Sequence, residues 1–585
     1  MPSHRLCLLV ATACLVTVSP AFGAVAASSR GSAPAAATSR VDGSTTVTYD
    51  VPTRRGTLHL EVVHPTWHGS IVRAPAILTY SPYSVLGRNG DAGAFVPHGY
   101  ARMYADVVGT GDSGGCYDYG GLGEQESGHD LIEWVAAQRW STGKVGMIGG
   151  SYDGTTQYAA AITHPRHLTT IIPEAAISRW YDYAYSGGMR YTDSSEQYGK
   201  EGLTRATDEG ADTPAGFDFG FAIPPPTDVT DPNFAERVRS KLRVCQQADH
   251  TLHGYSTTPT YDAFWRERDY VSRLPTVTIP VLVASNWGDY NVKQVESWDA
   301  YHALTHSRFR RYYMGTRWAG HGTPPGSAYG AVVQAWFAHY LQGADNGLEH
   351  SLPPVTTQTS DSSGPGSYTS GAEPRTRGAV FAAATDGTLV SGPAPGTGTR
   401  SFTITGTGTE AARGADYTDG GGAAGFLAFV SAPLTHDLHY YGEPVVTVRT
   451  TTGRSFLSLT PALLDVDPAT RRGSTATTSD AVVAIDRGWL DSRYRQGLDR
   501  VVGLPAGKPF AFTVALKPSD YIVRKGHRLV LLVQSEELDW AAATPDATCA
   551  RADCATWTVG TGGLQTTVTF PEVVSPSAHG GPGRG

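Results

Sequence analysis

Charged residues, sulfur and long apolar runs are all scarce in this sequence of 585 residues. Only 17% of the residues are charged and the net charge is −8, so the chain lacks the basic surface that nucleic acid would require. Beyond the N-terminus no apolar run is long enough to span a membrane. The six cysteines form neither a CxxC pair nor a Cys/His cluster, which argues against zinc, and we expect no metal and no cofactor.

The N-terminus has the features of a secretory signal peptide. Arg5 precedes an apolar stretch over residues 6–18, and small residues suited to cleavage stand at Ala24 and Ala26. We therefore predict a signal peptide over residues 1–26, a disordered Ala/Ser/Gly-rich stretch over 27–44, and a secreted, extracellular protein without a membrane contact after cleavage.

Four cysteines remain after the signal peptide. Cys549 and Cys554 are close in sequence and predict a local disulfide, which leaves Cys116 and Cys245 as the other pair. Four cysteines allow three connectivities, so this pairing is a hypothesis.

Residues 45–350 alternate short apolar runs with helix-like stretches, which predicts an α/β domain with a mostly parallel central sheet. The expected strands are 74–83, 100–109, 144–150, 168–176, 279–289 and 308–316. The expected helices are 129–140, 155–164, 293–304 and 328–341. A polar, aromatic block over about 185–275 interrupts the alternation, and we interpret it as a mainly helical cap inserted over the carboxyl edge of the sheet.

The composition changes after residue 350. Residues 361–378 resemble a linker, and short β-rich runs separated by Gly, Pro and Asp follow them. This pattern predicts a C-terminal β-sandwich over residues 351–575, of the jelly-roll, galactose-binding-like type, and a disordered tail over 576–585.

Two serines stand among glycines. Ser113 lies in "GTGDSGG" (109–115), which matches the nucleophile motif of chymotrypsin-like proteases letter by letter. That fold needs its histidine upstream of the serine and an all-β surrounding, whereas the sequence around Ser113 alternates strands and helices. We interpret this stretch as a glycine-rich loop.

Ser151 lies in "GGSYDG" (149–154), between a predicted strand and a predicted helix. A serine at such a joint is the nucleophile elbow of α/β-hydrolases, in which a tight turn exposes the hydroxyl at the edge of the sheet. Gly149 fits the motif Gly-x-Ser-x-Gly, but Asp153 stands at the position of the second glycine and Gly154 comes one residue late. On the elbow alone, an ordinary serine in a strand-to-helix turn remains the alternative.

The pattern Gly-x-Ser-Tyr-x-Gly resembles the elbow of the S15 peptidase family, which comprises Xaa-Pro dipeptidyl-peptidases and cocaine-esterase-like hydrolases. Val108 replaces an arginine that is usual in the family, so any role of that arginine is absent here. The resemblance spans residues 45–575 and favours the peptidase branch. Further matching stretches are "SPY" (81–83), "DVVGTGDSGG" (106–115), "AAISRWYDY" (175–183), "FWRERDY" (264–270), "NWGDYNVK" (286–293) and "AGHGTPP" (319–325).

The α/β-hydrolase fold requires its catalytic triad in the order Ser, Asp, His. Ser151 is the predicted nucleophile, Asp289 the acid at the end of a buried strand, and His321 the base in a Gly/Pro loop. The fold supplies one oxyanion donor, the N–H of Tyr152. The resemblance implies that the hydroxyl of Tyr83 is the second.

The resemblance implies cleavage of peptides with proline at the second position. Such an enzyme must bind a free amine and a proline ring. Trp180 and Tyr181 are candidates for the ring, and Asp182, Glu196 and Glu201 for the amine. An esterase or α-amino-acid ester hydrolase of the same superfamily is the alternative, and a glycan-binding protein with an inert hydrolase domain is a third. The sequence leaves a homo-oligomer open.

Overall fold

The computed structural model describes residues 40–83, 90–191, 259–403, 425–451, 457–467, 482–504, 507–535, 537, 540–541 and 556–574. They all belong to one unit, Thr38–Gly585. The predicted signal peptide, most of the predicted cap and the predicted C-terminal tail lie outside the described residues.

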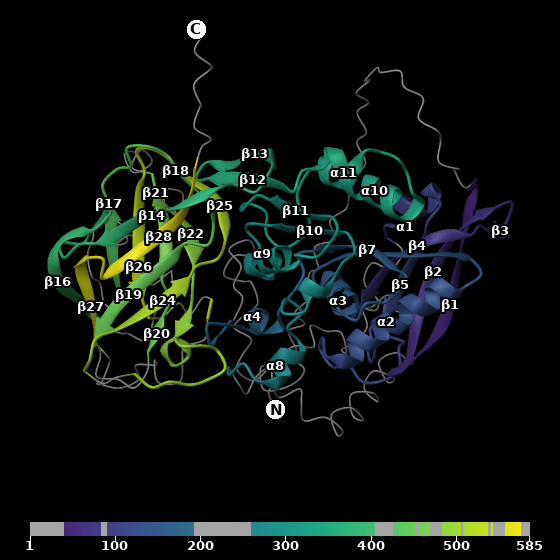
Figure 1. Ribbon diagram of the computed structural model, residues 1–585, viewed down its shortest axis with the longest axis horizontal. Coiled ribbons are helices and arrows are strands. Elements are labelled where there is room, and N and C mark those ends of the chain that lie inside the picture. The colour runs from purple at the N-terminus through teal and green to yellow at the C-terminus, as the bar shows by residue number, and fades with distance from the viewer. Residues whose placement is uncertain are drawn as a thin grey trace, which may run out of the picture. The chain divides into compact units, whose positions relative to one another are not determined.

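A mostly parallel sheet organises the first part of the chain (Figure 1). Strands β1 and β2 form an antiparallel hairpin, and β2 also pairs antiparallel with β5. The remaining neighbours in the sheet, β5, β4, β6, β7, β10, β11 and β12, run parallel to one another. The order is β1 (Gly43–Thr53), β2 (Gly56–Trp67), β5 (Ala101–Asp106), β4 (Ala74–Ser81), β6 (Ser141–Gly150), β7 (Leu168–Glu174), β10 (Val281–Asn286), β11 (Arg310–Gly315) and β12 (Val355–Asp361). A short strand β3 (Ser70–Ile71) extends β2.

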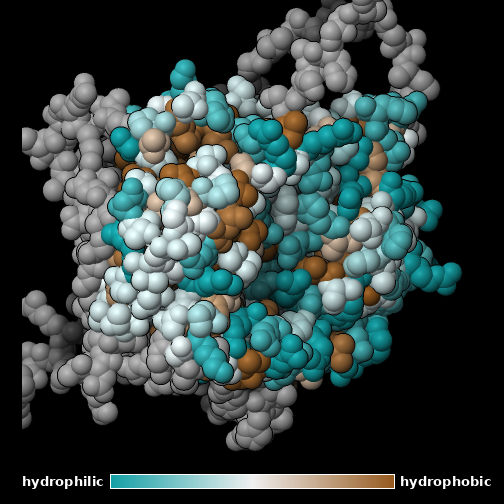
Figure 2. All heavy atoms as spheres, turned by 60° about the vertical axis from the view of Figure 1, so that its left-hand side comes forward, coloured by the Kyte–Doolittle hydropathy of each residue, from teal (hydrophilic) through white to brown (hydrophobic). Residues whose placement is uncertain are grey.

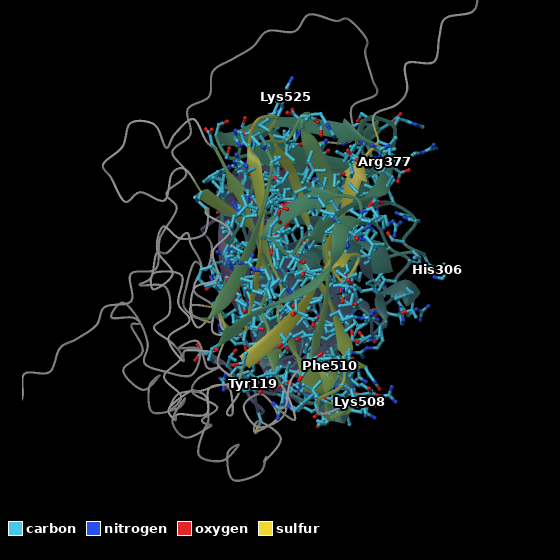
Figure 3. All side chains as sticks on the ribbon, turned by 90° about the vertical axis from the view of Figure 1, so that its left-hand side faces the viewer. Tyr119, His306, Arg377, Lys508, Phe510 and Lys525 are labelled. Carbon is cyan, nitrogen blue, oxygen red and sulfur yellow. The ribbon has the colours of Figure 1, made fainter. Side chains whose placement is uncertain are left out.

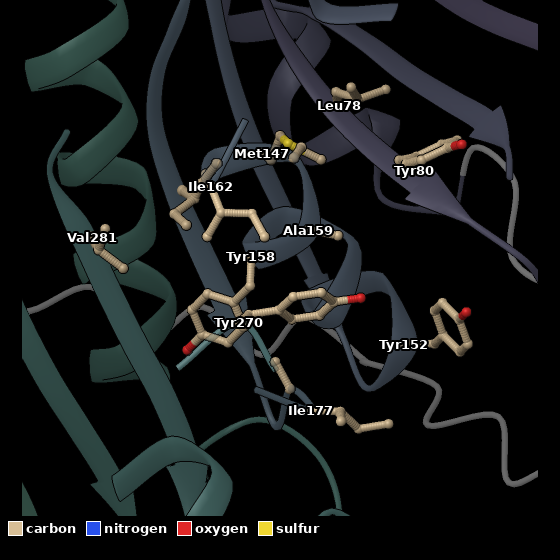
Figure 4. Close-up of a cluster of buried hydrophobic side chains, with 14 of the residues drawn as sticks. Leu78, Tyr80, Met147, Tyr152, Tyr158, Ala159, Ile162, Ile177, Tyr270 and Val281 are labelled. Carbon is tan, nitrogen blue, oxygen red and sulfur yellow. The ribbon is translucent and has the colours of Figure 1, made fainter. Parts of the chain in front are cut away.

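Helices cover both faces of this sheet because successive side chains of a strand point to opposite faces. Leu78 and Met147 pack with α2 (Leu122–Ala137), α3 (Tyr152–Ala161) and α9 (Gln294–Ala303) in one buried cluster. Their neighbours Ile77 and Ile148 pack with α10 (Ser327–Gln342) in another. Figure 4 shows Leu78 and Met147 near Tyr158 of α3. The sheet is therefore buried on both sides, as the apolar runs predicted.

The C-terminal part consists of two groups of strands that share one core. Val446 and Phe570 from the first group and Phe429 and Leu531 from the second lie in the same buried cluster. The first group contains β14 (Thr376–Ala383), β16 (Ala394–Thr403), β18 (Leu438–Gly442), β19 (Val445–Thr451), β24 (Phe510–Ala515), β25 (Ser519–Val523), β27 (Thr556–Gly563) and β28 (Thr566–Val573). The second contains β15 (Thr388–Ser391), β17 (Phe426–Ser431), β21 (Ala462–Val466), β22 (Val482–Arg487) and β26 (Arg528–Gln534). The predicted β domain is present, and its jelly-roll connectivity stays a prediction.

The expected linker over 361–378 is wrong. Strand β13 (Gly364–Gly371) pairs antiparallel with β12 within this stretch. Most of its side chains are exposed, so the sequence carries no apolar signal, and its backbone hydrogen bonds to β12 hold it as a strand. At the other end, β1 begins at Gly43, inside the stretch expected to be disordered.

Buried polar contacts join the two parts of the chain. Ser360 of β12 is paired in parallel with Tyr521 of β25. The indole of Trp287 donates to Thr357, whose hydroxyl donates to Asp520 at 2.8 Å. Both side-chain bonds are buried, where a hydrogen bond is electrostatically stronger than in water.

Polar and apolar residues are interspersed on the face in Figure 2. Figure 3 looks onto the C-terminal domain, where Lys508 and Phe510 lie at the end opposite to Lys525. Within the described ranges, no helix is both long and apolar enough to cross a membrane. The exposed large apolar residues of these ranges are Ile71, Leu122, Trp318, Val501, Leu564 and Val574.

Candidate active site

Ser151 stands at the joint between β6 and α3. Its backbone angles are φ 62° and ψ −129°, a region that residues with a side chain rarely adopt. Its N–H donates to the carbonyl of Glu174 at the end of β7, at 2.9 Å, which holds the turn against the sheet. A strained serine between a strand and a helix is the geometry of a nucleophile elbow.

The spacing of the glycines follows from close packing in this turn. A Cβ atom on Gly149 would lie 2.5 Å from the Cβ of Asp153. A Cβ atom on Gly154 would lie 2.7 Å from the Cβ of Ala176 and 2.8 Å from the carbonyl oxygen of Glu174. The second glycine is therefore required at residue 154, where α3 crosses β7, and residue 153 has room for a side chain.

Two hydrogen-bond donors meet beside Ser151. The hydroxyl of Tyr83 donates to Ser151 Oγ at 3.1 Å, and the N–H of Tyr152 is directed at the same tyrosine hydroxyl. Burial, together with the nearby carboxyl of Asp153, raises the pKa of Tyr83 to about 12. Tyr83 therefore keeps its proton at neutral pH and remains a donor.

Tyr152 is anchored at the far end of its side chain. Its hydroxyl donates to Glu124 Oε2 at 2.7 Å, and its ring meets Trp180 edge-on at 5.0 Å between centroids. Glu124 is fully buried, and burial, followed by the charge of Asp118, raises its pKa to about 8. Sequence reasoning missed Glu124, which lies 28 residues from its partner.

Asp289 and His321 form a hydrogen-bonded pair. His321 Nδ1 lies 2.9 Å from Asp289 Oδ2, and the Asp289 side chain has no exposed surface. The other oxygen of Asp289 accepts the N–H groups of Asn291 and Val292, at 3.1 and 2.9 Å. This arrangement meets the expectation that a carboxylate at the end of a buried strand must be paired. It leaves Nε2 as the ring nitrogen of His321 that Asp289 does not engage.

Ser113 has a different environment. It is fully buried, its hydroxyl donates to the carbonyl of Asp106 at 2.7 Å, and it accepts the N–H of His59 at 2.9 Å. The N–H of Gly114 donates to the carbonyl of Thr57. The hydroxyl therefore fastens the glycine-rich loop to β2, as the loop interpretation of "GTGDSGG" requires.

Two family models match the chain in tandem. Residues 56–322 match the model of the X-Pro dipeptidyl-peptidases of the S15 family, and this range contains Ser151, Asp289 and His321. Residues 346–562 match the model of the C-terminal non-catalytic domain of X-Pro dipeptidyl-peptidases. The chain belongs to the S15 peptidase family.

Curated relatives agree with this membership. A protein of Streptomyces avermitilis assigned by name to the Xaa-Pro dipeptidyl-peptidases is 27% identical, over 81% of this chain and 76% of its own length. The Xaa-Pro dipeptidyl-peptidase of Ligilactobacillus salivarius is 27% identical, over 44% of this chain and 32% of its own length.

Solved structures show the same fold. An α-amino acid ester hydrolase superposes with a TM-score of 0.69 at 20% identity, covering 93% of this chain and 98% of that one. An aminopeptidase from a marine sediment archaeon of the Thaumarchaeota superposes with a TM-score of 0.68 at 18% identity, covering 91% and 97%. At these identities the likeness concerns the fold, an S15 α/β-hydrolase domain followed by a C-terminal β domain.

Of the candidate substrate residues of this S15 chain, Trp180 lies against Tyr152. Trp180 is fully buried, touches the Tyr152 ring and donates from its indole to the hydroxyl of Tyr270 at 3.1 Å. Tyr181 is also fully buried, and its hydroxyl donates to the carbonyl of Pro259 at 2.6 Å. Both rings therefore pack inside α4 (Trp180–Ala184) and its neighbours, and the structure brings Trp180 nearer to the site than Tyr181.

Asp182 belongs to a network of charges. Its carboxylate lies 2.5 Å from Arg179 Nη1, and Asp299 and Asp269 lie 3.3 and 3.4 Å from the same guanidinium. Burial opposes the charge of Arg179, but the three carboxylates outweigh it and raise its pKa. Burial and the charge of Asp182 likewise raise the pKa of Glu296 to about 7. A site that concentrates carboxylates in this way favours a cation.

Five predicted site residues fall outside the described residues: Glu196, Glu201, Cys245, Cys549 and Cys554. Cys116 is disulfide-bonded. Its pairing with Cys245 stays a prediction. Within the described ranges, no group of three or more His, Cys, Asp or Glu side chains is arranged to hold a metal ion.

Proposed function

We propose that this protein is a secreted serine exopeptidase that releases Xaa-Pro dipeptides from the N-termini of peptides through an acyl-enzyme. The observation that carries the proposal is the strained Ser151 with the Tyr83 hydroxyl at 3.1 Å and the Tyr152 N–H beside it. Donors at this position stabilise the oxyanion of acyl transfer. Membership of the S15 family makes a serine peptidase the class of enzyme.

The chemistry proceeds in two halves. In the first, Ser151 Oγ attacks the carbonyl carbon of the proline residue, and its proton passes to His321 Nε2. The negative oxygen is held by Tyr83 and Tyr152, and Asp289 stabilises the imidazolium through Nδ1. The C–N bond then breaks, and the leaving amine takes the proton from His321. In the second half His321 takes a proton from a water molecule, and the resulting hydroxide attacks the carbonyl carbon of the ester. The C–O bond to Ser151 then breaks, Ser151 Oγ takes the proton back from His321, and the dipeptide leaves as the acid.

An exopeptidase of this kind must bind the free amine at a fixed distance from the carbonyl group that reacts. Asp182, Glu196 and Glu201 are the proposed partners of the ammonium group, and Trp180, with Tyr181 behind it, is the proposed wall of the proline subsite. The carboxylates of Asp182 and Asp299 beside Arg179 support an ammonium site at Asp182, since a free amine pairs with a carboxylate.

The test compares three chromogenic substrates. We expect hydrolysis of Gly-Pro-p-nitroanilide, loss of turnover when its N-terminus is acylated, and weak turnover of a simple p-nitrophenyl acyl ester. Efficient hydrolysis of the ester or of the acylated peptide would instead make the protein an ester hydrolase. Ser151→Ala, which removes the nucleophile, must abolish both turnover and labelling by a fluorophosphonate.

Export is part of the same proposal. We propose cleavage after a signal peptide over residues 1–26, and disulfides between Cys116 and Cys245 and between Cys549 and Cys554. Intact-mass spectrometry of the protein in culture medium, before and after reduction, measures both the new N-terminus and the number of disulfides. Recovery of the full-length chain in the cell fraction would refute export.

A further inference from the structure

Asn286, the last residue of β10, lies between the two residues of the acid–base pair. Its side chain is buried, and its Nδ2 group donates to the carbonyl oxygens of Gly320 at 2.9 Å, Gly322 at 3.1 Å and Thr323 at 3.2 Å. The first two of these carbonyls flank His321 on either side in the chain. One amide group therefore fixes the backbone of the loop that carries the base.

The same residue also fixes the acid. The backbone carbonyl of Asn286 accepts the N–H of Asp289 at 3.1 Å, which closes the turn that aims the Asp289 carboxylate. Asn286 therefore bonds to both sides of the acid–base pair. Its main-chain carbonyl holds the turn of Asp289, and its side chain holds the loop of His321, which lies 2.9 Å from Asp289.

Close packing around Asn286 leaves this arrangement little freedom. A Cβ atom on Gly315 would clash with Asn286 Oδ1, and a Cβ atom on Gly288 would lie 2.5 Å from the carbonyl oxygen of Ala319. Within the described residues, Asn286 Oδ1 is buried without a hydrogen-bond partner. Retaining a polar oxygen in this state costs stability. An apolar residue would avoid that cost, so the donor function of Nδ2 is what requires an amide here.

We propose that Asn286 is a positioning residue for catalysis: it holds the His321 loop at the distance from Asp289 at which the imidazole works as a base. It does not touch the substrate. The inference rests on the proposed triad of Ser151, Asp289 and His321, and it is independent of which substrate the enzyme accepts.

The test is Asn286→Asp, which keeps the shape of the side chain but replaces the donor by an oxygen that repels the three carbonyls. Displacement of a catalytic group by about 1 Å costs about 100-fold in rate. We expect kcat on the best substrate, and the rate of fluorophosphonate labelling, to fall by about that factor while KM changes by less than about twofold. In Asn286→Ala, which adds no charge beside the ring, the imidazolium loses part of its stabilisation by Asp289, and the acid limb of kcat/KM should move to lower pH by about one unit.

Gln294→Glu is the matched control. Gln294 is equally buried, its Oε1 also lacks a partner within the described residues, and its Nε2 donates to the carbonyl of Trp287, outside the His321 loop. We expect this variant to lose thermal stability without a shift of the acid limb. Asn286→Ala removes the donor without burying a charge and covers the case in which Asn286→Asp does not fold.

A folded Asn286→Ala or Asn286→Asp variant with the wild-type acid limb and wild-type labelling would overturn the proposal. An equal loss of kcat with an unshifted limb in Gln294→Glu would reduce Asn286 to a structural role. Failure of the proposed triad looks different, since the wild-type protein would then not react with the fluorophosphonate through Ser151 at all.

Discussion

The hydroxyl of Tyr83 is the most direct test of the oxyanion site. Tyr83→Phe removes one oxygen and leaves the ring in place. In the ground state the bond to Ser151 Oγ contributes about 1 kcal/mol, as ordinary hydrogen bonds do. In the transition state the same hydroxyl faces a full negative charge in a buried site, where one donor contributes about 3 to 4 kcal/mol. We expect kcat to fall about 100- to 1000-fold, with little change in Tm.

The protonation state of Tyr83 does not complicate this test. Its pKa of about 12 means that at pH 8 only about one molecule in ten thousand has lost the proton, so the wild-type enzyme should show no alkaline limb from Tyr83 in that range. The assay is steady-state turnover of Gly-Pro-p-nitroanilide between pH 6 and 9, with thermal unfolding measured in parallel.

Tyr158→Phe is the control for the same chemical change. Tyr158 is fully buried in α3, and its hydroxyl has no hydrogen-bond partner within the described residues. Its removal should leave kcat unchanged and stabilise the protein slightly. Near wild-type turnover of Tyr83→Phe would refute the assignment of the donor, and an equal loss in Tyr158→Phe would show that the effect is not specific to the oxyanion site.

Three further predictions follow from buried groups. Ser113→Ala should lower the free energy of unfolding by about 1 to 3 kcal/mol, because the hydroxyl makes two hydrogen bonds in the interior. It should leave kcat and fluorophosphonate labelling unchanged, and loss of labelling would make Ser113 the candidate nucleophile again. Gly154→Ala should destabilise the protein by about 1 to 3 kcal/mol, because the added methyl group overpacks the turn. Gly330→Ala, in an open position on α10, should stabilise it by up to about 1 kcal/mol. Thermal unfolding of both variants measures the difference, and the reverse order would contradict the close packing at the elbow. Burial raises the pKa of Glu124 from 4.5 to about 8, so the native state holds a proton that the unfolded state releases, and stability falls as pH rises from about 4.5 to 8. Glu124→Gln should therefore gain stability over wild type progressively across this range, and thermal unfolding of both proteins at several pH values measures the difference.

The strands of the central sheet were predictable because parallel strands that are buried on both faces read as apolar runs. The expected strand over 279–289 is β10 (Val281–Asn286), and that over 308–316 is β11 (Arg310–Gly315). Helix α2 was predicted to begin at residue 129 and begins at Leu122, because glycines at 123 and 128 hide its first turns.

The residues that support the site were not predictable in the same way. The order of the triad is a property of the chain, so Ser151, Asp289 and His321 could be named from spacing and resemblance. Glu124 accepts the hydroxyl of Tyr152, 28 residues away in the chain. Asn286 donates to three backbone carbonyls of the His321 loop, about 34 residues away. No periodicity or motif records such contacts, since they exist only once the strands are side by side.

The elbow shows why a stretch that matches a motif imperfectly can have the geometry expected of a nucleophile when a full match does not. "GTGDSGG" agrees with a protease motif at every letter, but the hydroxyl of its serine is engaged by two backbone groups, the carbonyl of Asp106 and the N–H of His59 in β2. "GGSYDG" departs from Gly-x-Ser-x-Gly because the crossing of α3 over β7 falls at residue 154, where the nearest atoms leave no room for a Cβ. The fold requires a glycine wherever another part of the chain comes too close for a Cβ atom. The place of that close contact, and not the number of matching letters, decides where the motif needs its glycines.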